Sequence, residues 1–342
     1  MPPHLRAIAT AVPPYRIDQT TAEILARSLF PGMLDRLGPI HANAGISTRW
    51  SCVPPDWYQR PHGWRERSTL FVEHGLRLSE LAIVTCLARA GIGLGQVDAI
   101  VAVSTTGICT PSLDALLIDH LSLRPDVVRL PIFGLGCAGG VLGLARAAAL
   151  AQSLPGRNIL LVVTELCGLT FRPQERTPAN AVATALFGDG CAAALVSTSA
   201  DGPAIAASGE HTWPNSLDVM GWRVEDDGLG VVFSRDIPPL ITRLFRQALN
   251  DWLGRNGLAR DDIRGFCCHP GGAKVVAALE QALDLPADAL ADERAVLREY
   301  GNMSAATVLF VAERRLRRPL PGRTLMTALG PGFTAAFLLL DP

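Results

Sequence analysis

One cysteine of this sequence lies between glycines, at the point where an apolar run gives way to an alanine-rich segment. Cys137 follows the apolar stretch 130–135 and precedes the alanine-rich stretch 138–154. Glycines on both sides allow a turn that a β-carbon would obstruct, and a helix that starts here directs its free N–H groups and positive dipole end at the sulfur. Both effects favour the thiolate, which is the nucleophilic form of cysteine. The pattern therefore predicts a reactive thiol.

Two other interpretations of this segment stay open at this point. A structural cysteine buried in a tightly packed turn would show the same residue types. Gly134, Gly136 and Gly139 also satisfy the dinucleotide-binding pattern G-x-G-x-x-G between a strand and a helix. Glu165 ends the next strand, where a ribose-binding carboxylate would be sought. A nucleophile, in contrast, requires a proton acceptor and donors for an oxyanion elsewhere in the chain.

Two later turns supply such partners. His269 ends the apolar run 263–268 and precedes a Pro-Gly-Gly turn, so its imidazole is predicted at the carboxyl edge of a sheet, where ligands collect in α/β proteins. Asn302 follows a glycine at the start of a helix. Taken alone, the histidine reads as a satisfied core residue and the asparagine as a helix N-cap. A cysteine, a histidine and an asparagine at three such boundaries together indicate a catalytic site.

Composition limits the kind of protein that carries these residues. The chain has 342 residues, 49% hydrophobic and 18% charged, with a formal net charge of −1. This length can bury a large core, and the balanced charge argues against nucleic acid as a partner. No apolar run approaches the roughly 20 residues of a membrane span, and the N-terminus lacks a signal-peptide core. We therefore expect a soluble, cytoplasmic protein without a membrane span.

The eight cysteines have no paired spacing and lie mostly in apolar segments, which is typical of reduced thiols in a cytosolic enzyme. No Cys-x-x-Cys pair occurs. Of the consecutive residues Cys267, Cys268 and His269, only the first and the last could face one ligand. We therefore expect no metal site.

Short strands and helices alternate along the chain and must position these residues. Strands are predicted at 99–104, 127–133, 158–163, 191–197, 263–268, 323–329 and 333–341. Helices are predicted at 112–121, 138–154, 238–256, 272–283 and 304–317. This rhythm is typical of α/β layers. Residues 1–200 and 201–342 are predicted to repeat one plan, because strand, glycine turn and helix occur at Cys137 and again at His269.

Five motifs together give the sequence a family resemblance. They are Gly136-Cys137-Ala138-Gly139-Gly140, Ala185-Leu186-Phe187-Gly188-Asp189-Gly190, His269-Pro270-Gly271-Gly272, Tyr300-Gly301-Asn302-Met303-Ser304 and Gly330-Pro331-Gly332-Phe333. Over nearly its whole length the chain resembles the type III polyketide synthases, the chalcone and stilbene synthase-like family of thiolase-fold condensing enzymes. The resemblance implies a homodimer with a duplicated α/β fold of five layers, αβαβα, in which the first half carries the cysteine and the second half the histidine and asparagine.

The resemblance also implies roles for three catalytic residues. Cys137 would take the starter acyl group from an acyl-CoA, and His269 would hold its pKa below the roughly 8.5 of a free cysteine. N–H donors of His269 and Asn302 would bind the thioester oxygen of malonyl-CoA, so that loss of CO₂ leaves an enolate that attacks acyl-Cys137. Acyl-CoA and malonyl-CoA are then the substrates, and no metal, nicotinamide or flavin cofactor is expected.

The expected cavity residues indicate an aliphatic starter. Phe187 is implied as an aromatic gate, while Val231 stands where a second gate phenylalanine is expected, and Cys167 stands where a threonine is common. Small residues would open an apolar tunnel for a long acyl tail, at about 0.8 kcal/mol per buried methylene, unless they are ordinary close-packing positions. These and the remaining expected lining residues are Thr105, Thr106, Cys109, Gly168, Thr170, Gly221, Ser304 and Leu329.

Four residues are candidates for contact with CoA. By resemblance, Arg36 stands at a basic position that contacts phosphate, and Gly271 and Gly272 lie beside the tunnel. Lys274, on the helix that follows, would pair with a phosphate as a point charge, or it is a solvated surface lysine.

The sequence thus predicts a synthase that loads a medium- or long-chain fatty acyl-CoA on Cys137, adds a few malonyl-CoA units and releases an alkylpyrone or alkylresorcinol. One alternative starts from malonyl-CoA and makes a polyhydroxynaphthalene. Another resembles ketoacyl-[acyl carrier protein] synthase III, with a single condensation, although the His269-Pro270-Gly271-Gly272 turn argues against it. The dinucleotide-binding protein is the alternative outside this class of enzyme.

Overall fold

The computed structural model describes residues 1–199 and 201–342 and is built around one sheet of nine strands. Their order is β11-β12-β13-β8-β1-β7-β6-β4-β5. The strands are β1 (His4–Ala11), β4 (Ala99–Ser104), β5 (Val128–Phe133), β6 (Ile159–Leu166), β7 (Asp189–Ser197), β8 (Ala204–Thr212), β11 (Gly265–Cys268), β12 (Thr324–Gly330) and β13 (Thr334–Asp341). Two antiparallel pairs stand apart from this sheet: β2 (Tyr15–Asp18) with β3 (Thr48–Ser51), and β9 (Met220–Glu225) with β10 (Gly228–Phe233).

The sheet consists of two parts that meet at β1 and β8. The register there pairs only His4 with Ala204, whereas β1 pairs with β7, and β8 with β13, along most of their lengths. The predicted boundary between the two halves falls at residue 200, which lies outside the described residues. Each half of the chain therefore contributes its own part of the sheet: β1 and β4–β7 come from the first half, and β8 and β11–β13 come from the second.

Helices cover both parts of the sheet and fill the space between them. They are α1 (Gln19–Leu29), α2 (Met33–Leu37), α3 (Trp64–Ala90), α4 (Leu113–His120), α5 (Gly139–Ser153), α6 (Pro178–Leu186), α7 (Ile237–Leu240), α8 (Arg246–Arg255), α9 (Ala273–Ala282), α10 (Ala291–Tyr300) and α11 (Thr307–Arg315). The predicted helix 238–256 is α7 and α8 joined by a π-helical turn, Ile241–Phe245.

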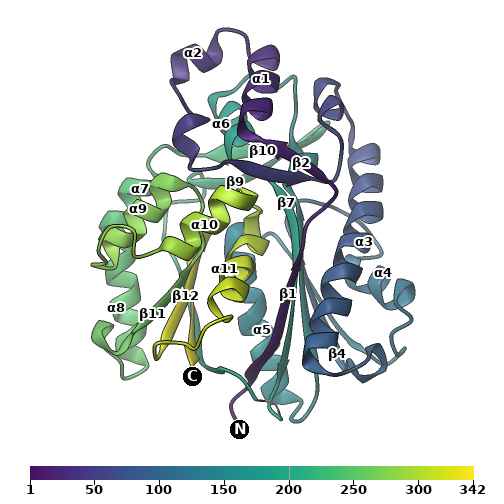
Figure 1. Ribbon diagram of the computed structural model, residues 1–342, viewed down its shortest axis with the longest axis vertical. Helices are drawn as coiled ribbons and strands as arrows, with labels where there is room; N and C mark the ends of the chain where they lie inside the picture. Colours follow the sequence, from purple (N-terminus) through teal and green to yellow (C-terminus); the bar gives the residue numbers. More distant parts are fainter. Residues whose placement is uncertain (200) are drawn as a thin grey trace.

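The layers are visible side by side in Figure 1, with α3 and α4 on one outer face, α8 and α9 on the other, and α5 and α11 in the middle. One core cluster joins α5 and α11 to strands of both parts of the sheet. A second lies under α3, and a third under α8 and α9. The fold confirms the predicted α/β class with thiolase-like layers.

Composition explains why α5 can occupy the central layer. Its sequence is rich in glycine and alanine, and ten of its residues are buried, including Gly139, Gly140 and Gly143. Small side chains allow the helix to approach strands on both sides. The neighbouring strands β6 and β7 are buried at every position, as expected for strands that are covered on both faces.

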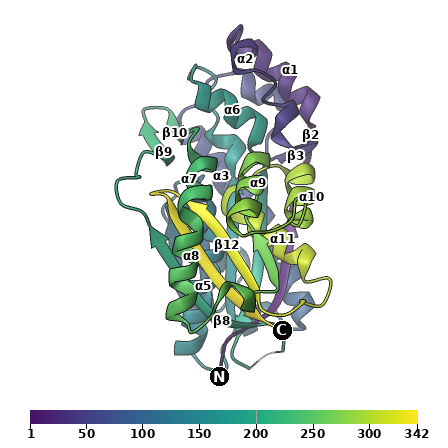
Figure 2. The ribbon, with the colours of Figure 1, turned by 90° about the vertical axis from the view of Figure 1, so that its left-hand side faces the viewer.

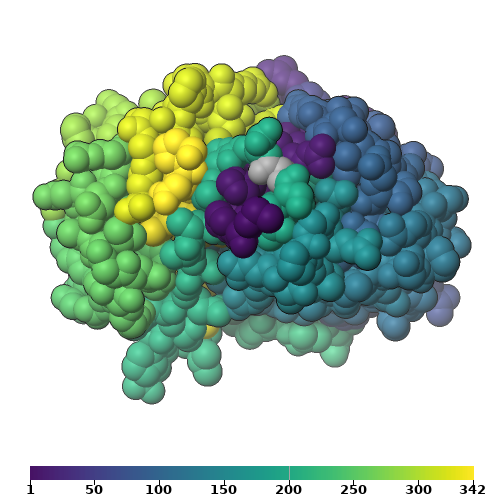
Figure 3. Space-filling view, turned by 90° about the horizontal axis from the view of Figure 1, so that it is seen from below, coloured from purple at the N-terminus to yellow at the C-terminus, as the bar shows by residue number. Residues whose placement is uncertain are grey.

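The two ends of the molecule differ in what they carry. The chain termini lie together at the lower end, and Figure 3 shows the N-terminal and C-terminal residues near each other on that face. The helices α1, α2 and α6 and the β9–β10 hairpin lie at the upper end (Figures 1 and 2). Across residues 1–199 and 201–342, no helix combines the length and apolarity that crossing a bilayer requires.

Candidate active site

Cys137 lies in a 3₁₀ turn, Gly136–Ala138, between the end of β5 and the first residue of α5. Gly136 has a φ of +47°, and a β-carbon there would lie 2.4 Å from Cδ of Pro331. A β-carbon on Gly140 would lie 2.3 Å from the backbone oxygen of Ala305. The glycines around the cysteine are therefore needed for close packing of this turn against two later segments of the chain.

This packing contradicts the dinucleotide interpretation. A β-carbon on Gly139 would also meet protein, at 2.8 Å from Val103, so the turn has no open approach for a pyrophosphate. Glu165 is fully buried, and one oxygen of its carboxylate accepts hydrogen bonds from the Thr106 hydroxyl at 2.6 Å and the Thr105 amide at 3.0 Å. It is therefore bound within the protein and is not free to hold a ribose.

The structure brings Cys137, His269 and Asn302 to one pocket, which we call the catalytic pocket. It spans about 450 Å³, part of which is open to solvent. Its other lining residues are Met220, Phe233, Ile237, Ile241, Gly271, Val275, Leu279, Thr327, Ala328 and Leu329. Three residues spread over 165 positions of the chain, from Cys137 to Asn302, therefore share one small and largely apolar space.

Hydrogen bonds fix the orientation of Asn302 and leave His269 available. The Asn302 amide nitrogen Nδ2 donates to the carbonyl of Gly271 at 3.1 Å, and Oδ1 accepts from the Ser304 amide at 2.9 Å. His269 is buried, and neither ring nitrogen has a hydrogen-bond partner among the described residues. An amide N–H and an imidazole N–H can therefore both be offered to an oxygen in this pocket.

Burial sets the protonation of the cysteine and histidine. The Cys137 side chain is partly exposed. Burial by the surrounding protein raises its pKa to about 12, and a hydrogen bond with the Ser304 hydroxyl partly opposes this rise. Burial lowers the pKa of His269 to about 3. The sequence analysis expected a cysteine pKa below that of a free thiol, whereas burial shifts the pKa of this thiol in the opposite direction.

Glu165 is a site residue that the sequence analysis did not place near the nucleophile. Burial raises its pKa to about 7, while the bonds from Thr106 and Thr105 partly oppose the shift. Its charge in turn raises the pKa of Cys137. The signal that could have found it is a glutamate near the end of a fully buried and mostly apolar strand, β6, where a carboxylate needs a local reason to be buried.

Phe187 lies beside the catalytic pocket, immediately after α6. It forms an isolated parallel bridge with Asn302, and its ring centre lies 5.6 Å from that of Phe233 and 5.9 Å from that of Trp222. The sequence analysis expected the valine at 231 to leave this gate open. Trp222, which pairs across the hairpin with Val231, supplies an aromatic partner instead.

A second space, which we call the side pocket, lies between α1, α6 and the β9–β10 hairpin. It spans about 690 Å³, part of which is open to solvent, and its lining is mostly apolar. Four expected cavity residues line it: Cys167, Thr170, Phe187 and Val231. Gly168 and Trp222 also line it, as do Ile17 of β2 and four residues of α1: Ala22, Leu25, Ala26 and Leu29. The sequence analysis did not predict this contribution from α1.

Other expected lining residues serve the nucleophile's surroundings or lie elsewhere. The hydroxyl of Thr105 accepts a hydrogen bond from the Gly136 amide at 2.9 Å, and Oγ of Ser304 lies 3.9 Å from Sγ of Cys137. Gly221, with a φ of +155°, faces Pro331. Cys109 lines a separate, open groove with Phe133. Of the five small residues expected along the tunnel, Gly168 lines the side pocket and Cys109 this groove, so the course of the tunnel stays a prediction.

The candidate CoA contacts are only partly brought together. Gly271 lines the catalytic pocket, and a β-carbon on Gly272 would lie 3.6 Å from Leu186. Arg36 and Lys274 are exposed and line neither pocket. Arg36 lies on α2, where its guanidinium donates to the Gly32 carbonyl at 3.2 Å.

Comparison with known proteins decides the family. Residues 60–200 match the N-terminal domain of chalcone and stilbene synthases, and residues 204–341 match the C-terminal domain. The chain belongs to the chalcone and stilbene synthase family. It is a type III polyketide synthase, a malonyl-CoA-dependent condensing enzyme with acyltransferase chemistry.

Named relatives of this type III polyketide synthase make different products. It is 38% identical to a 1,3,6,8-tetrahydroxynaphthalene synthase of Streptomyces peucetius subsp. caesius, over 98% of this chain and 92% of that one. It is 27% identical to the alpha-pyrone synthesis polyketide synthase-like Pks18 of Mycobacterium tuberculosis, over 98% and 90%. The structure of 1,3,6,8-tetrahydroxynaphthalene synthase from Streptomyces coelicolor A3(2), a bacterial type III polyketide synthase, superposes with a TM-score of 0.91 at 27% identity, covering 99% of both chains.

Proposed function

We propose that this polyketide synthase condenses a medium- or long-chain fatty acyl-CoA with malonyl-CoA units and releases an alkylpyrone or an alkylresorcinol. The observation that supports this product class is the side pocket, an apolar space next to the gate residue Phe187. An aliphatic tail gains about 0.8 kcal/mol for each methylene that it buries there. A polyketide grown only from malonyl units is more polar and would gain less from such a lining.

In the proposed reaction, His269 takes the thiol proton as the sulfur of Cys137 attacks the starter thioester. The acyl–sulfur bond to CoA breaks, the departing CoA thiolate takes the proton from the imidazolium, and the acyl group remains on Cys137. Because thiol and imidazole are both neutral beforehand, the proton transfer creates a pair of opposite charges without changing the net charge of the pocket. The helix N-terminus at α5 favours the anionic partner.

Malonyl-CoA then binds with its thioester oxygen facing the N–H groups of His269 and Asn302. Its carboxylate leaves as CO₂, and the electron pair of the broken bond becomes an enolate whose negative charge lies on that oxygen. The enolate carbon attacks the acyl carbon, the bond to Cys137 breaks, and the sulfur is free again. Loss of one oxyanion donor typically costs about 10² to 10³ in rate.

A second candidate is supported by a relative rather than by the pocket. The 38% identity to the Streptomyces peucetius enzyme, which is named for tetrahydroxynaphthalene synthesis, is well above the 27% identity to the alpha-pyrone enzyme. A synthase primed by malonyl-CoA would use the same Cys137, His269 and Asn302. It would leave most of the side pocket empty.

The homodimer is also part of the proposal. The strand β5 is an edge of the sheet, and apolar side chains on and near it are exposed: Ile108 at 46%, Val128 at 44% and Phe133 at 57%. An unpaired edge with apolar side chains favours pairing with a second chain.

The division at residue 200 and the cytoplasmic location stay predictions of the sequence analysis, as do the CoA contacts of Arg36 and Lys274.

Incubation with ¹³C-malonyl-CoA and acyl-CoA starters from acetyl to stearoyl, read by mass spectrometry, tests the proposal. We expect alkylpyrones or alkylresorcinols in amounts that peak with medium or long starters. An aromatic product from malonyl-CoA alone would transfer the protein to the second candidate. A single condensation with each starter would instead support chemistry of the ketoacyl synthase III kind.

A further inference from the structure

The β9–β10 hairpin forms a wall that the two pockets share. Trp222 pairs across the hairpin with Val231, and Met220 pairs with Phe233, so alternation along the strands places all four side chains on one face. Trp222 and Val231 line the side pocket, whereas Met220 and Phe233 line the catalytic pocket. The position of the hairpin relative to α6 therefore sets the size of both spaces.

The hairpin needs its own means of attachment, because it forms a separate two-stranded sheet and shares no ladder with the nine-stranded one. An isolated two-stranded hairpin is only marginally stable by itself. Figure 2 shows it at the edge of the molecule, beside α6. Side-chain contacts must therefore hold it in place.

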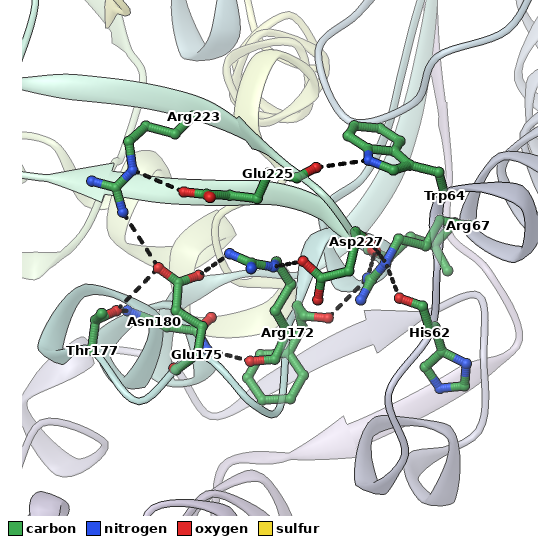
Figure 4. Close-up of polar contacts among 12 residues, drawn as sticks. His62, Trp64, Arg67, Arg172, Glu175, Thr177, Asn180, Arg223, Glu225 and Asp227 are labelled. Atoms are coloured by element: carbon green, nitrogen blue, oxygen red, sulfur yellow. Dashed lines mark hydrogen bonds and ion pairs between the residues drawn. The ribbon is translucent and has the colours of Figure 1, made fainter.

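One attachment is an ion-pair network between the hairpin and the loop that precedes α6 (Figure 4). Arg172 Nε lies 2.6 Å from an oxygen of Asp227, in the hairpin turn, and Arg172 Nη1 lies 2.8 Å from an oxygen of Glu175. Arg223 of β9 reaches the other oxygen of Glu175 at 3.5 Å. The amide of Asn180, in α6, donates to the Arg172 carbonyl at 2.7 Å and ties this loop to the helix.

A second attachment joins the hairpin to α3. Arg67 Nε donates to the carbonyl of Asp227 at 3.0 Å, and its Nη1 donates to the carbonyl of Phe171 at 2.9 Å. The indole nitrogen of Trp64 donates to the carbonyl of Glu225 at 2.8 Å (Figure 4). The hairpin turn is thus bound both by the loop before α6 and by α3. Arg67 also binds Phe171, the residue before Arg172.

Burial makes the Arg172 pairs sensitive to geometry. The side chains of Arg172 and Glu175 are 14% and 9% exposed, and that of Asp227 is 36% exposed. Buried pairs of this kind contribute little net stability, but removing one partner leaves an uncompensated charge. None of the three lines the catalytic pocket. The network can therefore affect the reaction only through the position of the hairpin.

We propose that Arg172 and Asp227 form a latch, which holds the hairpin against α6 and thereby determines which acyl chain lengths the side pocket accepts. The inference rests on the proposed function, in which that pocket holds the starter tail. With the latch closed, Trp222 packs against Phe187 and the pocket stays dry and tight. With the latch broken, the hairpin separates from α6, water enters, and each additional methylene of the starter gains less.

The test compares Arg172→Met and Asp227→Asn with a matched control, Arg124→Met. Arg124 also has two carboxylate partners, Asp98 at 3.2 Å and Asp126 at 2.9 Å, but it lies between α4 and β5, and none of its polar contacts involves the hairpin. The measured quantity is the ratio of kcat/KM for dodecanoyl-CoA to that for hexanoyl-CoA. We expect this ratio to fall about tenfold in both latch variants through KM of the longer starter, equivalent to about two methylenes of lost discrimination, and to be unchanged in Arg124→Met.

Two further measurements separate a latch from a general loss of structure. Hydrogen exchange should become faster at residues 220–233 in the latch variants, with the nine-stranded sheet unchanged, and Arg172→Lys should restore part of the starter discrimination. Decarboxylation of malonyl-CoA without a starter should continue in the latch variants, because Cys137, His269 and Asn302 do not contact the latch; a change in its rate reports how far Met220 and Phe233, which line the catalytic pocket, move with the hairpin. Should Arg172→Met fail to fold, Asp227→Asn, which keeps the side-chain shape, decides the question.

Faster exchange in the hairpin with an unchanged starter ratio would overturn the inference, as would a loss of discrimination equal to that of the Arg124→Met control. Failure of the proposed function would give a different result: the unmodified protein would accept no acyl-CoA starter other than malonyl-CoA. Hydrogen exchange would then still show whether Arg172 and Asp227 hold the hairpin in place.

Discussion

Replacing Val231 by phenylalanine is predicted to shorten the acyl chain that the synthase prefers. Val231 is 5% exposed and lines the side pocket next to its cross-strand partner Trp222. A phenyl ring in place of the isopropyl group would occupy the space of roughly three methylenes, each contributing about 0.8 kcal/mol when buried. The loss of about 2.4 kcal/mol corresponds to about a 60-fold fall in the ratio of kcat/KM for dodecanoyl-CoA to that for hexanoyl-CoA.

The matched control for this prediction is Val232→Phe. Val232 is the next residue of the strand, so its side chain points to the opposite face of the hairpin, and it lines neither pocket. Both starters compete in one incubation with ¹³C-malonyl-CoA, and mass spectrometry measures the two products. Overpacking a core position costs about 1–3 kcal/mol, so the thermal midpoint of each variant is measured as well. The reasoning is refuted if folded Val231→Phe shows the same starter ratio as Val232→Phe.

Three further predictions concern the nucleophile, a buried acid and a glycine. Cys137→Ala should abolish attachment of a starter acyl group, read as the intact mass of the protein, and Cys137→Gln should still decarboxylate malonyl-CoA without forming products. Glu293, which accepts a hydrogen bond from the Cys268 amide at 2.8 Å, has a pKa that burial raises from 4.5 to about 7. Between pH 4.5 and 7 the folded protein therefore binds more protons than the unfolded chain, so Glu293 lowers the free energy of unfolding by about 3 kcal/mol as pH rises through this range. In urea titrations, Glu293→Gln should remove this fall in stability. Gly140→Ala should destabilise the protein by at least about 1–3 kcal/mol, because the β-carbon would meet the backbone oxygen of Ala305 at 2.3 Å, whereas Gly63→Ala, with open space at its β-carbon, should not change the melting temperature by more than a degree or two.

Each of these predictions has a contradicting result. An acyl adduct on Cys137→Ala would show that another residue carries the starter. Equal pH dependence of unfolding in Glu293→Gln and the unmodified protein would mean that the carboxyl titrates alike in the folded and unfolded states. A melting temperature for Gly140→Ala equal to that of Gly63→Ala would show that the contact with Ala305 relaxes at little cost.

The predicted elements from residue 99 onward agree closely with the structure. Strands 99–104 and 127–133 appear as β4 and β5, and the helix after Cys137 appears as α5. Their signal is local, because apolar runs between glycine turns are nearly the same length as the strands they form. The region before residue 99 received no predicted element, although it holds the 27-residue helix α3. Its buried stripe is interrupted by polar residues such as the buried Arg67, which blurs the helical period.

Part of the candidate site could be read in the same way. Cys137, His269 and Asn302 each stand at a boundary between elements. The glycines beside Cys137 and Asn302 indicate positions where another segment of the chain packs too closely for a β-carbon. The acyl tunnel expected past residues 105, 106, 109, 168 and 221 stays a prediction, and of these five only Gly168 lines the side pocket. That pocket also lies against α1, and no pattern within α1 indicates which pocket its side chains line.

The sequence by itself determined the α/β plan, the turns that carry the cysteine, histidine and asparagine, and the family, because these depend on residue types and spacings that lie next to one another in the chain. Only the tertiary structure decided the direction in which burial shifts the pKa values of Cys137 and His269, because burial depends on segments far away in sequence. It also decided what faces Phe187. The sequence analysis predicted an open gate from Val231, but Trp222 packs against Phe187 there. The register of the hairpin places residue 222 opposite residue 231, and no local sequence pattern specifies which of them then contacts Phe187.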